Sequence, residues 1–82
     1  WVGDTPVHLT PTETKLLYIL LHNAGHVVSS SYLLQRLWPL EEAYEDKLRV
    51  HVRRLREKLE LDPGSPTYIL TERGSGYRFA VS

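Results

Sequence analysis

Cationic side chains are concentrated in one short segment of this chain. Positions 47 to 58 hold six of its ten Lys and Arg residues and a single acid, Glu57. The whole chain has a formal net charge of zero, so the positive charge of this segment is local. A local excess of cations favours binding to a polyanion, above all the phosphate backbone of DNA. The six cations are Lys47, Arg49, Arg53, Arg54, Arg56 and Lys58.

The same segment has the apolar period of an amphipathic helix, and we expect a helix over residues 46–60. Its buried face would hold Leu48, Val52, Leu55 and Leu59. The opposite face would present Val50, Arg53, Arg54 and Glu57, flanked by Lys47, Arg49 and Lys58. Glu57 lies one helical turn from Arg53 and could pair with it. The helix would thus be attached by its apolar side and would turn its cations to solvent.

Several outward side chains suit the chemistry of duplex DNA. The planar fork of Arg54 fits the O6 and N7 acceptors of guanine, and an exposed Val50 would be explained by contact with a thymine methyl. Arg53 and His51 are expected at phosphates, where they would set the register. Arg73, in a glycine-rich turn, suits a narrow minor groove. The alternative without a function is a solvated basic helix face that binds no ligand.

Local signals predict two helices before the cationic one. Thr10 to Glu13 reads Thr-Pro-Thr-Glu, a capping box with proline at the first helical position, and predicts a helix over residues 11–23 that Gly25 ends. Val27-Val28 is long enough only for a bridging strand. Ser29 or Ser30 would cap a second helix, with Leu33, Leu34 and Leu37 on its buried face and Trp38-Pro39 at its end.

Strands are expected at both ends of the chain. Trp1 to Leu9 has short apolar runs around Gly3-Asp4-Thr5-Pro6, which indicates a hairpin. Near the other end, strands Tyr68–Thr71 and Tyr77–Val81 would be joined by Glu72–Gly76, whose two glycines allow a tight turn and a close approach to another molecule. Three helices followed by a hairpin, with a cationic last helix, describe an α+β winged helix-turn-helix.

Composition excludes several other classes. Eighty-two residues make one small domain, without a cysteine, a membrane-length apolar run or a basic leader. Its four histidines lack metal-ligand spacing, and no nucleophile, base and carboxylate occur together, so we expect no metal, no cofactor and no catalysis. The remaining rival is a winged-helix module that binds protein instead of DNA.

Motifs along nearly the whole chain resemble the effector domain of OmpR/PhoB-type response regulators. They are Leu9-Thr10-Pro11-Thr12-Glu13, Val27-Val28-Ser29, Leu37-Trp38, the run from Val50 to Leu59, and Arg73-Gly74-Ser75-Gly76-Tyr77-Arg78-Phe79. The resemblance implies a winged-helix transcription factor domain over residues 1–82 that follows a receiver domain in a cytoplasmic bacterial protein. A sensor histidine kinase would act on that receiver. Some regulators carry similar domains without a receiver, so the parent protein remains open.

The resemblance also implies roles for individual residues. Base-reading candidates are Lys47, Val50, Arg54 and, in the minor groove, Arg73. Phosphate-contacting candidates are Trp38, His51, Arg53, Arg56, Thr71 and Tyr77. For Trp38 the alternative is a core aromatic that closes the second helix, and for Tyr77 it is packing beside Phe79. We expect specific binding to duplex DNA as tandem head-to-tail copies on direct repeats about one helical turn apart.

This chain departs from the family pattern at three places. Asp46-Lys47 stands where Arg-Thr is common, which moves the expected phosphate contact of that position to Lys47. Arg49 stands where an acid is frequent, so the preferred bases would differ. Glu72 replaces a common apolar residue and puts a negative charge beside Arg73, where it would weaken or retune the minor-groove contact.

An acidic loop precedes the cationic helix. The segment from Trp38 to Asp46 resembles the loop through which the family engages RNA polymerase, and its acids would suit a basic patch on the sigma factor or on the α subunit. The residues expected at that contact are Leu40, Glu41, Glu42, Tyr44 and Glu45. The alternative is an ordinary solvated loop.

Overall fold

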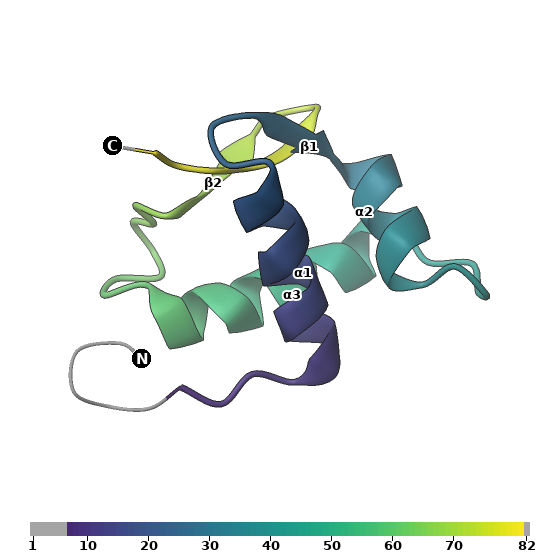
Figure 1. Ribbon diagram of the computed structural model, residues 1–82, viewed down its shortest axis with the longest axis horizontal. Helices are drawn as coiled ribbons and strands as arrows, with labels where there is room; N and C mark the ends of the chain where they lie inside the picture. Colours follow the sequence, from purple (N-terminus) through teal and green to yellow (C-terminus); the bar gives the residue numbers. More distant parts are fainter. Residues whose placement is uncertain (1–6, 82) are drawn as a thin grey trace.

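Three helices and a three-stranded antiparallel sheet make up residues 7–81, the part of the chain that the computed structural model describes (Figure 1). The expected winged helix-turn-helix order is confirmed. The elements are α1 Pro11–His22, β1 Val27–Ser29, α2 Ser30–Leu37, α3 Glu45–Leu59, β2 Ile69–Glu72 and β3 Gly76–Phe79.

Local capping decides where the first two helices begin. The Thr10 hydroxyl accepts from the Glu13 backbone N–H at 3.2 Å, and the Glu13 carboxylate accepts from the Thr10 N–H at 3.0 Å, so the predicted capping box is present. Of the two serines proposed for the second cap, Ser29 is the one used, accepting from the Tyr32 N–H at 3.2 Å. These side-chain acceptors satisfy N–H groups that no preceding helical turn can reach.

The third helix begins without a side-chain cap. Tyr44 occupies the cap position and makes no capping hydrogen bond through its side chain. Glu45 and Asp46, which the sequence left between loop and helix, form the first turn. Negative charge there is favourable because the backbone N–H groups at a helix N-terminus carry partial positive charge.

The sheet joins the helical body to the hairpin. β3 lies between β1 and β2, with Ser29 opposite Gly76 and Thr71 opposite Tyr77. A Cβ atom on Gly76 would stand 2.0 Å from the carbonyl oxygen of Val28, so only glycine lets β3 pair so closely with β1. Gly76, which the sequence analysis put in the turn, is therefore the first residue of β3. Gly74 makes the turn, with a φ of +80°.

The part of the expected N-terminal hairpin that lies within the described residues forms no strand. Its first arm and turn, residues 1–6, lie outside the described residues. Its second arm, Val7 to Leu9, is in no strand, although Leu9 packs against the core. A hairpin arm needs a paired neighbour to satisfy its backbone groups, and none of the described strands lies beside it.

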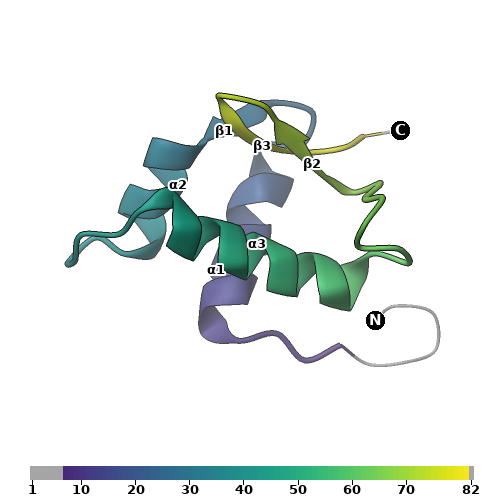
Figure 2. The same ribbon diagram turned by 180° about the vertical axis from the view of Figure 1, so that it is seen from behind.

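The core lies where the helices meet beneath the sheet. Figure 2 shows α3 crossing in front of α1, with the sheet above both helices. Leu48, Val52 and Leu55 are buried as predicted, and Leu59 is partly buried against the same cluster. The other core residues come from every remaining element: Leu16, Ile19, Leu20, Val28, Leu33, Leu37, Ile69 and Tyr77. The apolar stripe of α3 therefore fixes which face of this helix turns outward.

Candidate nucleic-acid interface

The outward face of α3 is open to solvent along its length. Figure 2 shows this helix on the near side of the molecule, with its axis across the view. Val50, Arg53, Arg54 and Glu57 are all exposed, as expected. Val50 keeps 45% of its surface accessible, so an apolar side chain stands among cations without being part of the core.

Arg56 joins the last part of α3 to the sheet. Its Nε and Nη2 atoms donate to the carbonyl oxygen of Ile69 at 3.0 and 2.9 Å, and Nη2 also donates to the Thr71 hydroxyl at 2.8 Å. The guanidinium lies 5.8 Å from the ring centre of Tyr77. The exposed α3 surface therefore includes a cation that is already engaged by the protein.

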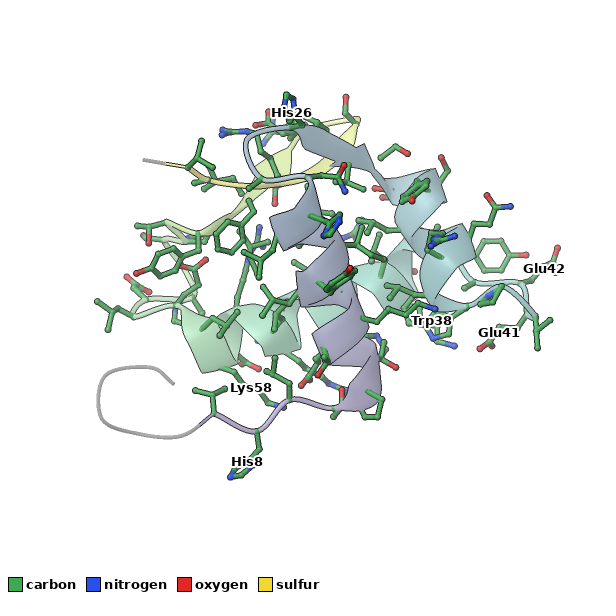
Figure 3. The ribbon with its side chains drawn as sticks, viewed as in Figure 1. His8, His26, Trp38, Glu41, Glu42 and Lys58 are labelled. Atoms are coloured by element: carbon green, nitrogen blue, oxygen red, sulfur yellow. The ribbon has the colours of Figure 1, made fainter. Side chains whose placement is uncertain are left out.

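Lys58 is engaged by a buried acid. Its ammonium forms an ion pair with Glu13, whose accessible surface is only 2%. Burial alone would raise the pKa of the Glu13 carboxyl, but the ion pair with Lys58 and the hydrogen bond from Thr10 outweigh it and hold that pKa below 4.5. This pair ties the start of α1 to the end of α3, where Figure 3 labels Lys58.

Acids also surround the cations in the first half of α3. Lys47 lies 3.1 Å from Glu41 in the preceding loop. Arg49 lies 3.3 Å from Asp46 and 3.7 Å from Glu45, both in the first turn of its own helix. Arg49, noted as a departure from the family pattern, thus stands beside two acids.

Arg53 and Arg54 differ from the other four cations. Neither makes an ion pair or a side-chain hydrogen bond with any of residues 7–81, and the pair suggested between Arg53 and Glu57 is not formed. Both guanidinium groups keep their donors available for a ligand. The six cations seen in the sequence therefore reduce to two that are exposed and uncommitted.

Trp38 and His51 form an aromatic cluster at the start of α3. Their rings meet edge to face with centres 4.9 Å apart, and the Trp38 ring packs against the core while Lys47 covers it at 4.7 Å. Nδ1 of His51 lies 2.8 Å from the Lys47 carbonyl oxygen. A carbonyl can only accept, so Nδ1 carries the hydrogen, and Nε2 can donate to a phosphate only when the ring is protonated. Trp38 thus packs against the core at the end of α2, and its phosphate contact stays a prediction.

The hairpin tip stands near the first half of α3. An open hollow of about 430 Å³ separates them, lined by Glu45 and Arg49 on one side and by residues 71–77 on the other. Arg73 is exposed at the tip. Glu72 is paired with Arg78, because its carboxylate accepts a hydrogen bond from Nε of that arginine at 2.8 Å. Part of the charge expected to oppose Arg73 is thereby neutralised.

Tyr77 is largely buried beneath the hairpin. It retains 7% of its surface and belongs to the core cluster, whereas Phe79, its neighbour in the packing alternative, stacks on Tyr68. Burial raises the pKa of its phenol, and the nearby Arg56 opposes part of that increase. The hydroxyl therefore stays neutral and can serve as a hydrogen-bond donor.

Glu60, directly after α3, has a role that the sequence analysis missed. Its carboxylate accepts the backbone N–H groups of Thr67, Tyr68 and Ile69 at 2.8 to 3.1 Å. Burial would raise the pKa of this carboxyl, but those three N–H donors lower it below its usual value. An acid directly after the last apolar position of an amphipathic helix, before a Pro-Gly loop, was a usable signal, although its partners could not be named from spacing.

Residues 7–81 contain no group of three or more His, Cys, Asp or Glu residues arranged to hold a metal ion. None of the helices in that range combines the length and apolar character needed to cross a membrane.

Comparison with known proteins agrees with this geometry. Residues 4–79 match the family model described as transcriptional regulatory protein, C terminal. The KDP operon transcriptional regulatory protein KdpE of Escherichia coli is 46% identical over 80 residues, which cover 96% of this chain and 36% of KdpE. The chain spans about a third of the length of the curated relatives it matches.

Solved structures share the fold. The response regulator DrrB of Thermotoga maritima, an OmpR/PhoB homologue, superimposes with a TM-score of 0.86 at 35% identity, covering 92% of this chain and 34% of DrrB. The DNA-binding domain of Klebsiella pneumoniae RstA, solved in complex with the RstA box, gives a TM-score of 0.81 at 29% identity, covering 95% of this chain and 78% of the RstA chain.

Proposed function

The chain belongs to the family of transcriptional regulatory protein C-terminal domains, DNA-binding domains of the response-regulator type, and on that premise we propose how it recognises DNA. Members of this family are transcriptional regulators and not enzymes. We infer that α3 enters the major groove and that the hairpin tip reaches the adjacent minor groove. The observation that carries this proposal is the exposed, uncommitted pair Arg53 and Arg54 beside exposed Val50.

Base reading is assigned to one stripe of α3. Lys47, Val50 and Arg54 follow one another at spacings of three and four residues, which places them on one side of a helix. We propose that Arg54 binds a guanine edge, that Val50 meets a thymine methyl, and that Lys47 reaches a base beside them. Arg73 is proposed for the minor groove.

Phosphate contacts are assigned around that stripe. Arg53 and His51 would position the helix on the backbone. Arg56 would use Nη1, because Nε and Nη2 already donate to the sheet. Three further donors would complete the phosphate contacts: the hydroxyls of Thr71 and Tyr77 and the indole N–H of Trp38. The proposed phosphate donors are therefore Trp38, His51, Arg53, Arg56, Thr71 and Tyr77.

Two substitutions test the division between base and phosphate contacts. Arg54→Ala should relax the preference at one base position by about 1–3 kcal/mol. Arg53→Ala should weaken all duplexes alike and reduce the salt dependence of the affinity by about one phosphate contact. Binding selections from a random duplex pool, with titrations at two salt concentrations, measure both effects. Equal losses for both variants on every sequence would reject the assignment, and an affinity independent of salt would reject DNA binding through α3.

The arrangement on DNA follows from the family. We propose that two copies bind head to tail on direct repeats, with half-sites about 10 base pairs apart. Binding measured on duplexes with repeat spacings changed by half a turn would test this, because half a turn places the second copy on the opposite face of the DNA.

The loop between α2 and α3 is proposed to contact RNA polymerase. Leu40 is 98% accessible and Tyr44 is exposed, so the loop offers apolar as well as acidic side chains. We propose that a basic patch on the sigma factor or the α subunit binds it, through Leu40, Glu41, Glu42, Tyr44 and Glu45. Substitution of these residues should reduce transcription activation while leaving the DNA-bound fraction measurable by footprinting.

The parent protein is proposed to be a two-component response regulator. The matched relatives are about three times as long as this chain, which leaves room for the expected receiver domain. A sensor histidine kinase, a separate protein, would act on that receiver. We place such a protein in the bacterial cytoplasm, where DNA and polymerase are found. Phosphorylation-dependent DNA binding by the longer protein would test this assignment.

A further inference from the structure

Lys47 is held by the loop that precedes its helix. The ammonium lies 3.1 Å from the Glu41 carboxylate and 4.7 Å from the ring centre of Trp38. Both partners are also outside α3: Trp38 ends α2, and Glu41 follows it in the loop. Figure 3 shows Trp38, Glu41 and Glu42 gathered at this end of the molecule.

This ion pair is the loop's main polar attachment to α3. Within residues 7–81, Glu41 is the only residue of the loop 39–44 whose side chain forms an ion pair. Its neighbour Glu42 is also an exposed glutamate but forms no ion pair in that range. The remaining links are backbone hydrogen bonds from Lys47 and Leu48 to the Tyr44 carbonyl, which any helix start would make.

Lys47 also stands at the first position of the proposed base-reading stripe. Its side chain is 38% accessible and that of Glu41 is 54% accessible, so both ends of the ion pair face solvent, where DNA would approach. When DNA approaches Lys47, the negative charge of its backbone meets that of Glu41 at the same time. Because like charges repel, Glu41 opposes that approach as long as it stays beside Lys47.

We propose that Glu41 competes with DNA for Lys47, so that DNA binding separates the α2–α3 loop from α3. This inference rests on the proposed function. Glu41 is then a positioning residue with two effects. It lowers DNA affinity by holding Lys47, and it keeps the loop close to the helix until DNA takes its place.

Glutamine substitutions at adjacent loop positions provide a matched test of affinity. Glu41→Gln and Glu42→Gln remove the same charge from neighbouring sites, but only the first breaks the ion pair. With the duplex that the wild-type domain enriches from a random pool, Glu41→Gln should bind about two- to fivefold tighter, because exposed ion pairs have that strength. Glu42→Gln should shift the affinity less. The difference in affinity between the Glu41→Gln and Glu42→Gln variants should shrink as the salt concentration rises, because salt screens the ion pair.

Lys47→Met separates competition from a general charge effect. In a Lys47→Met background, Glu41→Gln and Glu42→Gln should change the affinity equally, because the side chain that Glu41 holds is gone. An excess for Glu41→Gln that persists without Lys47 would overturn the inference.

Backbone relaxation reports on the loop itself. In the wild-type domain, ¹⁵N relaxation of the amides from Leu40 to Ala43 should show greater picosecond–nanosecond motion once the selected duplex is bound. Glu41→Gln should show that greater motion already without DNA and change little on binding, whereas Glu42→Gln should behave as wild type. A wild-type loop that is unchanged or stiffened by DNA would contradict the release.

The two proposals fail in different ways. If the wild-type domain enriches a duplex and binds it with steep salt dependence, while Glu41→Gln and Glu42→Gln are indistinguishable, only the role of Glu41 is overturned. If no duplex is enriched and the affinity for any duplex is insensitive to salt, DNA binding through α3 and the role of Glu41 are overturned together.

Discussion

Arg53 and Arg54 in the middle of α3 extend into solvent without a partner among residues 7–81, whereas Arg56 and Lys58, one turn further along, bind the protein itself. The two regions have the same kind of side chain and lie on one helix. The middle of α3 has no element in front of its outward face, while the last turn lies beside both the start of α1 and strand β2. A cation on a recognition helix therefore counts toward DNA binding only after its contacts within the fold are known.

The largest expected effect is the loss of stability on substitution of Glu60, the residue that follows the last turn of α3. Glu60→Ala would leave the N–H groups of Thr67, Tyr68 and Ile69 without their acceptor, and we expect the free energy of unfolding to fall by about 3 kcal/mol. Urea denaturation would measure it. Glu57→Ala, an exposed acid on the same helix, is the control and should stay within about 0.5 kcal/mol of wild type. A small loss for Glu60→Ala would mean that water replaces this carboxylate readily.

A second test removes the cation of the last turn. Lys58→Met would leave the buried Glu13 carboxylate without its ion pair, and we expect a loss of about 2 kcal/mol in the free energy of unfolding, below a fully buried pair because Lys58 is partly exposed. Lys15→Met on α1 provides the matched control. The DNA sequence preference of the folded Lys58→Met variant should be that of wild type. A changed DNA sequence preference would contradict the distinction between the middle of α3, which faces DNA, and its last turn, which binds the protein.

A milder substitution compares two arginines. Arg56→Lys cannot donate to Ile69 and Thr71 in the same forked geometry, so we expect a loss of about 1 kcal/mol in thermal or urea unfolding. Arg53→Lys should leave stability unchanged, because Arg53 has no such contacts in the described structure. Equal stability of both variants would show that Arg56 does not hold α3 to the sheet.

The smallest effect is expected in mild acid. The pKa values of Glu13 and Glu60 are lowered in the folded state, so both carboxylates stabilise the fold above their ordinary pKa of 4.5, and that contribution is lost as the pH falls through the lowered values. Each loss is at most about 0.4 kcal/mol at pH 4.5, where half of these carboxyls are protonated in the unfolded chain, and it grows below that pH. Unfolding measured from pH 7 to 3 would follow this loss. Glu13→Gln should make the free energy of unfolding depend less steeply on pH. An unchanged slope would exclude Glu13 as a cause of the acid destabilisation.

Much of the fold was predictable because its signals are local. The capping box at Thr10, the cap at Ser29 and the apolar stripe of α3 each depend on residues within a few positions of one another, and all three were confirmed. The pairing of Gly76 with β1 could not be predicted in this way, because the atom that excludes a side chain there belongs to Val28, far earlier in the chain.

By itself, the sequence determined the order of the elements, the outward face of α3 and the presence of six clustered cations, since helical period and composition need no knowledge of distant contacts. Only the tertiary structure decided which of those cations remain available. The partner of Lys58 lies 45 positions away and that of Arg56 lies 13 positions away, while Lys47 meets Glu41 only because the loop folds back onto α3. Charge is a property of composition, but whether a charge is already neutralised depends on neighbours that only the folded chain brings within a few ångströms.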